Sequence, residues 1–507
     1  MAEAALPVDG KSASTCAENM RLYVLAFAVV LAAELIGIVN VPVGPANIVL
    51  LPLLWALLIG GVWSLAEHRL PGPLRIGGAL QWRASAIVQL ALLLLVAKLG
   101  LLVGGSLPKL AAAGWALVFQ EFGHFFGTMA IGLPIALLLG IKREAIGATF
   151  SVGREPSLAI ISEKYGMHSP EGRGVLAEYI TGTIFGTVFM SILASVITSL
   201  NIFNPLSLAM GSGVGSASMM TAASGVIAAQ QSPELAKDVL AFAAASNLMT
   251  TIVGIYFTLF ISLPFTVWAY SLLEPVIGRT ATRTSAQVSK PINTPDDREY
   301  TAPQLSTGGH VLAWVFAGAF ALAGNWITYK TVLDPEVLGG IALILIVVLA
   351  GYGIHLLTKS KVPAVVCVSI LGIIATYPDF PMAATVVMLT GKINFLALTT
   401  PILAFAGLSI AKDVPAFRRL GWRIVVTSLS ASAGTFIAAT VIAQGFLLGK
   451  PCDVNGSAYH YRHKVFGKCA KVVRLSGDKA RPADMTALGR VSRVIAGPNG
   501  DARLYGR

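Results

Sequence analysis

Long apolar runs separated by short polar stretches form the main pattern along this chain. The runs lie near residues 22–40, 47–65, 86–104, 111–140, 145–163, 174–199, 205–229, 238–272, 310–328, 335–357, 362–378, 381–411 and 424–448. Runs of about 17–25 apolar residues are long enough to cross the hydrocarbon core of a bilayer as α-helices. The pattern therefore predicts about thirteen transmembrane helices, within a range of roughly 10–14.

Composition points to the same class of protein. Hydrophobic residues make up 55% of the chain and charged residues only 12%, whereas soluble domains contain about 25% charged residues. The alternating segments of about ten residues that build a transmembrane β-barrel do not occur in the sequence. We therefore expect an all-α polytopic protein that lies in the lipid bilayer.

Polar segments divide the chain into five regions. Residues 1–21 form a polar N-terminus without the apolar core of a signal peptide. A first membrane half, 22–272, and a second, 310–448, are joined by the polar linker 273–309. The basic tail 449–507 has no apolar run and no helical period, so we expect it to be disordered.

Basic residues suggest how the spans are oriented. With a cytoplasmic N-terminus, the basic residues of the linker and of several loops fall on the cytoplasmic side, as positive loops usually do. They include Arg69, Arg75, Arg83, Lys142, Arg143, Arg279, Arg283, Lys290, Lys359, Lys361, Lys412, Arg418, Arg419 and Arg423. The tail contributes +8 of the net charge of +12, and thirteen crossings would place it outside, against the same tendency. Because loops and tail account for the positive charge, no nucleic-acid partner is expected.

The run near 205–229 contains a segment that is poor in helix-forming residues. Its sequence "GSGVGSAS" comprises, among others, Gly211, Ser212, Gly213, Gly215, Ser216 and Ser218. Glycine is about 1 kcal/mol worse than alanine inside a helix, which favours unwinding there. Unwound backbone at membrane depth is tolerated where it lines a protein cavity, and its free groups can bind an ion or a carboxylate. The alternative is that these small residues only allow close helix packing.

Two further runs are interrupted in the same way. "SVGREPS" places Gly153, Arg154, Glu155 and Ser157 at the middle of the run near 145–163. Proline disfavours helix before it, and a charge at membrane depth usually marks function. A cytoplasmic loop is the alternative. The run near 381–411 is interrupted at "TGKIN", so Lys392 and Asn394 are also candidate binding residues, with a short surface hairpin loop as the other interpretation.

Ionisable residues in the runs are candidates for ion coupling. In "QEFGHFFG", Glu121 and His124 are three residues apart on one helix face and suit a proton relay. Glu155 is the other candidate, and we expect Asn247 to bond a neighbouring helix. The alternative for His124 is that Glu121 merely caps it at a membrane edge. The sequence has no P-loop, HExxH or GxSxG motif, which argues against ATP-driven transport and enzymatic activity. No cofactor and no metal site are predicted.

Residues 20–448 resemble an uncharacterised family of bacterial inner-membrane proteins. The resemblance rests on "GLPIALLLGIKREAIGATFSVGREPSLAIISEKYG", on "SPEGRGVLAEYITGTIFGT" and on "GSGVGSASMMTAASG". It implies a location in the bacterial inner membrane.

"ILAFAGLSIAKDVPAFRRLGWRIVVTSLSASAGTFIAATVIA" is more distantly similar to the last core helices of the cation:proton antiporter and anion transporter superfamily. That superfamily includes glutamate:sodium symporters and lysine exporters. This resemblance implies an inverted-repeat fold, broken helices that cross in a core domain, and a scaffold that forms a homodimer. It also implies Na⁺- or H⁺-coupled movement of a small solute.

These patterns lead to one main hypothesis. The protein is a secondary active transporter of a small organic solute that bears a carboxylate, bound where 212–218 and 153–157 meet. Arg154 would pair with that carboxylate or with Glu155. A cation:proton antiporter without organic substrate, and a membrane channel or sensor module, remain as alternatives.

Overall fold

The computed structural model describes most of the two membrane halves. It describes residues 16–43, 46–152, 155–166, 169–213, 215–278, 305–359, 362–414, 421–448, 493–496 and 502–505. The chain divides into two units, Met1–Pro451 and Cys452–Arg507. In the second unit, β3 (Arg493–Ala496) pairs with β4 (Ala502–Tyr505) in antiparallel register. The rest of the tail lies outside the described residues, and so do linker residues 279–304. The expectation that the tail is disordered therefore falls outside the description.

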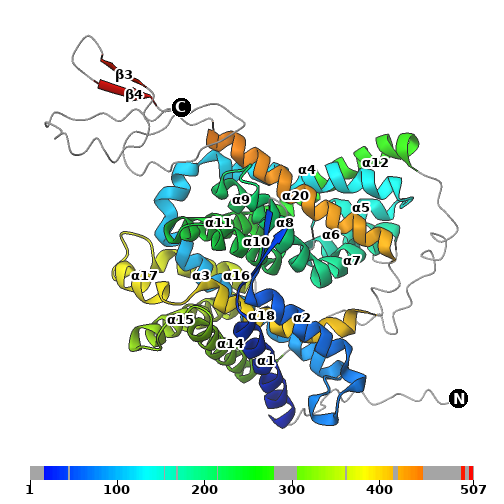
Figure 1. The fold of residues 1–507 in the computed structure, drawn as a ribbon. Helices are drawn as coiled ribbons and strands as arrows, with labels where there is room; N and C mark the ends of the chain where they lie inside the picture. The colour runs from blue at the N-terminus through cyan, green and yellow to red at the C-terminus, as the bar shows by residue number, and fades with distance from the viewer. Residues whose placement is uncertain are drawn as a thin grey trace, which may run out of the picture. The chain divides into compact units, whose positions relative to one another are not determined.

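The first unit is built almost entirely of α-helices (Figure 1). Up to residue 277 its elements are α1 (Cys16–Ile36), β1 (Val39–Val43), β2 (Ala46–Leu50), α2 (Pro52–Leu65), η1 (Glu67–Arg69), η2 (Gly72–Leu74), α3 (Gly78–Ala113), α4 (Trp115–Leu138), α5 (Glu144–Thr149), α6 (Glu155–Tyr165), α7 (Pro170–Thr181), η3 (Gly182–Gly186), α8 (Thr187–Ser199), α9 (Pro205–Ser212), α10 (Ala217–Ala229), α11 (Pro233–Phe257), η4 (Thr258–Ser262) and α12 (Leu263–Ile277). After the linker follow α14 (Thr307–Ile327), α15 (Pro335–Leu357), α16 (Ala364–Ala375), α17 (Ala383–Gly391), α18 (Phe395–Ser409), η5 (Ile410–Asp413) and α20 (Trp422–Leu448).

Helix length and composition support a multi-pass membrane protein. Within the described residues, 8 continuous helices are long and apolar enough to cross a bilayer. Three shorter apolar helices, α2, α10 and α16, accompany them. The all-α class expected from the sequence is therefore confirmed.

Close glycine contacts hold two helix pairs together. α20 runs beside α4 (Figure 1), and a Cβ on Gly127 of α4 would lie 2.5 Å from Gly434 O of α20. α2 packs on α18 in the same manner, because a Cβ on Gly407 would lie 2.6 Å from Leu57 O. Small residues let membrane helices approach until their backbones touch, which is the packing mode seen at both pairs.

Several expected spans prove to be composite. The run near 47–65 begins with an extended strand, β2, which pairs with β1 from Val39↔Leu50 to Val43↔Ala46. Pro52 then starts α2, where its missing N–H costs nothing. The run near 174–199 is one continuous helix, 170–199, whose middle widens into the π-helical turn η3. Runs 145–163, 205–229 and 381–411 each break into two helices.

Candidate functional site

The first broken segment, α5–α6, turns back on itself. Arg143, just before α5, pairs with Glu171 in the first turn of α7 at 2.6 Å. Glu144, the first residue of α5, pairs with Arg173, two residues further along α7, at 2.9 Å. α6 ends at Tyr165, five residues before α7 begins. Both ends of this first helical hairpin (residues 144–165) therefore lie at the N-terminal end of α7.

The second broken segment, α9–α10, turns back at the other end of the same helix. α9 begins shortly after Ser199, the last residue of α8. Gln230 follows α10, and Ser199 Oγ donates to its Oε1 at 3.0 Å. Gln230 Nε2 in turn donates to Ser195 Oγ at 3.3 Å. Both ends of this second helical hairpin (residues 205–229) therefore lie at the C-terminal end of α8.

The two hairpins meet between the ends of the helix 170–199. At 1.5 Å per residue this 30-residue helix is about 45 Å long, enough to cross a membrane. A Cβ on Gly215, at the tip of the second hairpin, would lie 3.4 Å from Val152 Cγ1, at the tip of the first. The sequence hypothesis that the two breaks lie together therefore agrees with the contact between their tips.

Side chains of α11 hold the second break in place. Gly215 has φ = 73°, a left-handed conformation that glycine adopts without strain. Asn247 Nδ2 donates to Gly213 O at 2.9 Å and Ser246 Oγ donates to Met210 O at 2.8 Å. Met210 O also accepts from Gly213 N at 3.1 Å, where α9 ends. The side chains of α11 therefore bind backbone carbonyls of the break within the protein.

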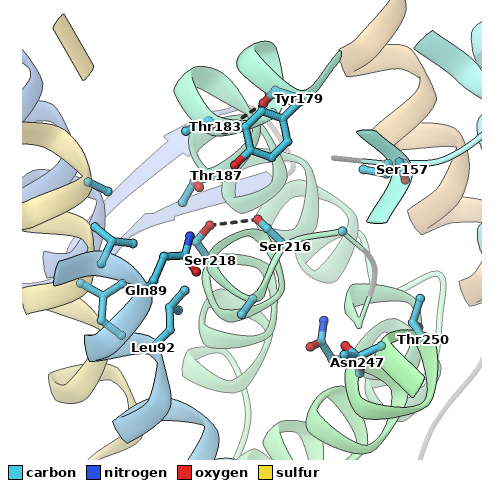
Figure 2. A pocket seen from close by; sticks show the side chains of 18 of the residues that line it. Gln89, Leu92, Ser157, Tyr179, Thr183, Thr187, Ser216, Ser218, Asn247 and Thr250 are labelled. Atoms are coloured by element: carbon cyan, nitrogen blue, oxygen red, sulfur yellow. Dashed lines mark hydrogen bonds between the residues drawn. The ribbon is translucent and has the colours of Figure 1, made fainter. Parts of the chain in front are cut away.

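A cavity of about 340 Å³ lies at the hairpin tips (Figure 2). Its wall is rich in hydroxyl groups, which come from several helices. They belong to Ser85, Ser151, Ser157, Tyr179, Thr183, Thr187, Ser216, Ser218, Thr250, Thr251, Thr258, Ser409 and Thr435. Figure 2 shows Ser216 and Ser218 joined by a hydrogen bond of 2.9 Å, with Gln89 and Thr187 nearby and Asn247 and Thr250 further along the wall.

Two helix N-termini open onto this cavity. α10 begins at Ala217, and both Ala217 and its N-cap Ser216 line the wall. α6 begins at Glu155, and Ser157 in its first turn lines the wall as well. A helix N-terminus presents unpaired N–H groups and the positive end of its dipole, so both termini favour a negatively charged group in the cavity.

A buried polar cluster borders the cavity on α4. Glu121 and His124 are 4% and 2% exposed, and His124 lines the wall. Thr250 Oγ1 of α11 lies 2.8 Å from Glu121 Oε1 and 3.1 Å from His124 Nδ1. His124 Nδ1 is 3.4 Å from Glu121 Oε2. Gln120 Nε2 also donates to Glu121 Oε1 at 2.6 Å. The histidine is therefore part of a buried network and does not sit at an exposed helix edge.

Lys412 and Asp413, at the end of the η5 turn, add a charged pair to the wall. Lys412 Nζ lies 2.8 Å from Asp413 Oδ2, and both side chains are largely buried. Sequence reasoning counted Lys412 only as a cytoplasmic basic residue. Threonines 183 and 187 of the helix 170–199 were also missed. A signal existed in "GTIFGT", since a Gly-Thr pair occurs twice there, four residues apart, within an apolar run.

Most predicted binding residues fall at or near the hairpin tips. Ser157, Gly215, Ser216, Ser218 and His124 line the cavity. Gly211, Ser212 and Gly213 lie behind the wall, where Gly213 packs against Ser246. Gly153 and Arg154 lie outside the described residues. Glu155 is the first residue of α6, and its side chain lies outside the description. The predicted partnership of Arg154 with Glu155 therefore stays a prediction.

Lys392 and Asn394 lie apart from the cavity. Asn394 caps α18 by accepting from Leu396 N at 2.9 Å, and its own N–H donates to Asn325 Oδ1 at 2.8 Å. Lys392 Nζ pairs with Glu336 and with Asp334, the latter at 3.1 Å. The hydrogen bonds that Lys392 donates to Glu336 and to Asp334 raise the pKa of Lys392. These contacts fit the hairpin-loop interpretation of this break and leave the two residues outside the candidate site.

The long apolar helices and the two broken helices around a polar cavity define a multi-pass helical membrane protein. Residues 31–272 of the chain match a protein family described as "Protein of unknown function (DUF3100)". The matched range includes both helical hairpins and fits the expected resemblance to an uncharacterised family. Comparison with curated proteins and with solved structures gave no match. The comparisons therefore lend no support to the distant resemblance to the transporter superfamily.

Proposed function

We propose that this protein is a secondary active transporter of a small organic solute that bears a carboxylate. One observation supports the proposal above all: two helical hairpins start from opposite ends of one long helix and meet at a polar cavity. Interrupted helices that meet near the middle of a membrane are the usual binding site of secondary transporters. The two helix N-termini at the cavity suit a carboxylate.

The hairpins also suggest a topology. About thirteen apolar segments were expected; if the two hairpins re-enter the membrane instead of crossing it, about eleven crossings remain. The N-terminus and the Arg143 end of the first hairpin would then face the cytoplasm of a bacterial cell, and the Gln230 end of the second would face outward. Two hairpins that enter the membrane from opposite sides are what an inverted repeat would produce. Each hairpin could then close the cavity toward the side from which it enters.

Transport is tested by uptake into proteoliposomes that contain the full chain. The panel consists of radiolabelled succinate, citrate and glutamate, each under an imposed Na⁺ or H⁺ gradient. We expect saturable, gradient-dependent uptake of at least one of them. If none of the three acids accumulates, although the protein in the preparation is folded and unfolds cooperatively, the proposal of carboxylate transport is wrong.

Two variants connect the uptake to the cavity. Gly213→Ala places a methyl group against Ser246 Oγ and displaces the second hairpin, so we expect uptake to be lost. Ser216→Ala removes the N-cap hydroxyl of α10 and weakens solute binding. Gly353→Ala in α15 is the matched control, because a Cβ there meets nothing within 4 Å. Uptake that survives Gly213→Ala unchanged would place the solute elsewhere.

A cation:proton antiporter is the second candidate. The buried Glu121–His124 pair at the cavity favours it, because ionisable groups at membrane depth commonly serve proton relays. The same proteoliposomes separate the two candidates. Proton flux driven by Na⁺ or K⁺ alone, without any solute, would support the antiporter. Flux that does not saturate and needs no gradient coupling would indicate a channel.

A further inference from the structure

The ionisable side chains around the cavity differ in whether their polar atoms have partners. Within the described part of the wall, Lys412 and Asp413 are an acid and a base that pair with each other. His124 is different, because only its Nδ1 has a polar contact. His124 Nε2 is buried and has no hydrogen-bond partner among the residues that the structure describes. Burying a polar nitrogen without a hydrogen-bond partner costs free energy, unless a bound ligand supplies the partner.

The contacts of His124 define its tautomer. Thr250 has a single hydroxyl proton, which Glu121 Oε1 at 2.8 Å or Ser246 O at 2.9 Å can accept. Thr250 Oγ1 is then free to accept from His124 Nδ1. This network assigns the proton of the neutral ring to Nδ1 and leaves a lone pair on Nε2. His124 can therefore accept a proton at Nε2, and the Glu121 carboxylate would stabilise the resulting imidazolium.

Few other titratable groups face the ring. Glu121, Thr250 and Phe125 contact it, and of these only Glu121 titrates. The elements packed against α4 are α3, α5, α9, α11, α12, α20 and η4. Their buried or paired ionisable groups make contacts elsewhere, namely Glu144 with Arg173, Glu274 with Lys142, Asp238 with Lys109, and Lys98 with Thr390 O. Tyr179 and the Lys412–Asp413 pair are the ionisable groups in other parts of the described wall.

We propose that His124 is the site where a proton and the solute carboxylate bind together, so that the coupling ion is H⁺. The inference rests on the transport function proposed above and specifies its coupling. A proton from solution adds to His124 Nε2, and the new N–H donates to the carboxylate in the cavity. Glu121 and Thr250 are positioning residues that hold the ring. No bond other than this N–H is made or broken.

Linkage gives the size of the expected effect. If protonation of His124 tightens carboxylate binding about tenfold, a bound carboxylate favours protonation of His124 by the same factor, because coupling between two sites is reciprocal. Binding should therefore tighten as the pH falls through the titration of His124 and level off below it. Each bound carboxylate should take up as much as one proton where His124 is neutral beforehand.

The test measures binding and proton uptake by the full chain in detergent. Radiolabelled succinate, citrate and glutamate are titrated from about pH 5 to pH 9, across the range where histidine titrates. A pH dye in weakly buffered solution reports the protons taken up. We expect tighter binding at low pH and proton uptake with each binding acid. His124→Gln should keep weak binding but lose both the pH dependence and the proton uptake.

Two further variants separate a coupling role from a structural one. Thr250→Val removes the hydroxyl between Glu121 and His124 and should lower the pH at which binding tightens. Thr128→Val is the matched control on α4, because Thr128 Oγ1 only bonds Phe125 O of its own helix, at 2.7 Å. Binding that is independent of pH, or unchanged pH dependence in His124→Gln, overturns the role of His124 and leaves transport intact. If none of the three acids binds, carboxylate transport and the coupling proposal both fail.

Discussion

Gly215 and Val152, at the tips of two different helical hairpins, are more than 60 residues apart in the sequence, yet a Cβ on Gly215 would lie 3.4 Å from Val152 Cγ1. The same Cβ would lie 3.2 Å from Met219 Sδ. Each hairpin tip is thus part of the surface against which the other packs. The cavity lies beside this contact, because both Val152 and Gly215 line it.

The tip contact predicts coupling between substitutions. Gly215→Ala puts a side chain into a left-handed backbone conformation, at a cost of roughly 1–2 kcal/mol, and also crowds Val152. Val152→Ala removes the group that is crowded. We expect the double variant to be more stable than the sum of the single effects allows, by about 0.5 kcal/mol or more. Unfolding in detergent measures all four proteins, and strictly additive effects would mean that the tips do not touch.

Asn247 predicts a second stability effect at the same break. Its Nδ2 donates to Gly213 O, which has no helical partner. Asn247→Asp keeps the size of the side chain but replaces the donor by an acceptor. We expect a loss of about 1–3 kcal/mol, because the carbonyl is left unsatisfied and faces a carboxyl group. Thr128→Val on α4 is the control, because it leaves the break untouched. Thr251→Val, four residues after Asn247 on α11, is a poorer comparison. A stable Asn247→Asp protein would show that water satisfies Gly213 O.

The sequence predicted the fold class and the helix breaks for direct physical reasons. Bilayer thickness sets the length of apolar runs, and clustered glycines or a proline beside charged residues weaken a helix locally. Both signals are local, so "GSGVGSAS" and "SVGREPS" could be recognised without a structure. Asn247 was expected to bond a neighbouring helix, and it bonds the break itself.

Non-local features could not be predicted in this way. Whether a broken run crosses or turns back depends on what its ends contact, such as Glu171 for Arg143 and Ser199 for Gln230. Lys392 looked like a binding residue because its partners, Asp334 and Glu336, are far away in sequence. Lys98 was overlooked inside an apolar run, although its Nζ donates to Thr390 O at 2.5 Å in the buried interior.

The Lys392 pair predicts a pH-dependent contribution to stability. The backbone N–H of Val337 and then Lys392 lower the pKa of Asp334 below its usual 3.8. The contribution of Asp334 is therefore fully present above pH 3.8 and is lost as the pH falls through the lowered pKa. Lys392 has a raised pKa, so its contribution is present below pH 10.5 and is lost above that. Asp334→Asn keeps a capping oxygen for α15 but loses the charge.

We expect Asp334→Asn to lower the unfolding temperature slightly at neutral pH, and the difference from the wild type to shrink as the pH falls below 3.8. The effect should also shrink at high salt, because both partners are partly exposed. Asp379→Asn, in the loop after α16, controls for the loss of one negative charge. A difference that is the same at all pH values would show that the cap, and not the ion pair, is responsible.

Cysteine accessibility tests whether the hairpins re-enter the membrane. The four native cysteines are first replaced, and single cysteines are introduced at exposed positions by Glu163→Cys in the last turn of α6, Ile202→Cys before α9 and Ser232→Cys after α10. Intact cells and opened cells are then treated with a maleimide that does not cross membranes. Each position is scored by whether opening the cell is needed for labelling.

Two re-entrant hairpins and thirteen crossings give opposite patterns. With re-entrant hairpins, both ends of α9–α10 lie on one side, so positions 202 and 232 label alike and position 163 labels from the other side. With thirteen crossings, 163 and 232 label alike and 202 differs. The ion pairs at the start of α7 and the hydrogen bonds of Gln230 lead us to expect the first pattern. The second would separate groups that lie 2.6–3.0 Å apart here by the thickness of a membrane.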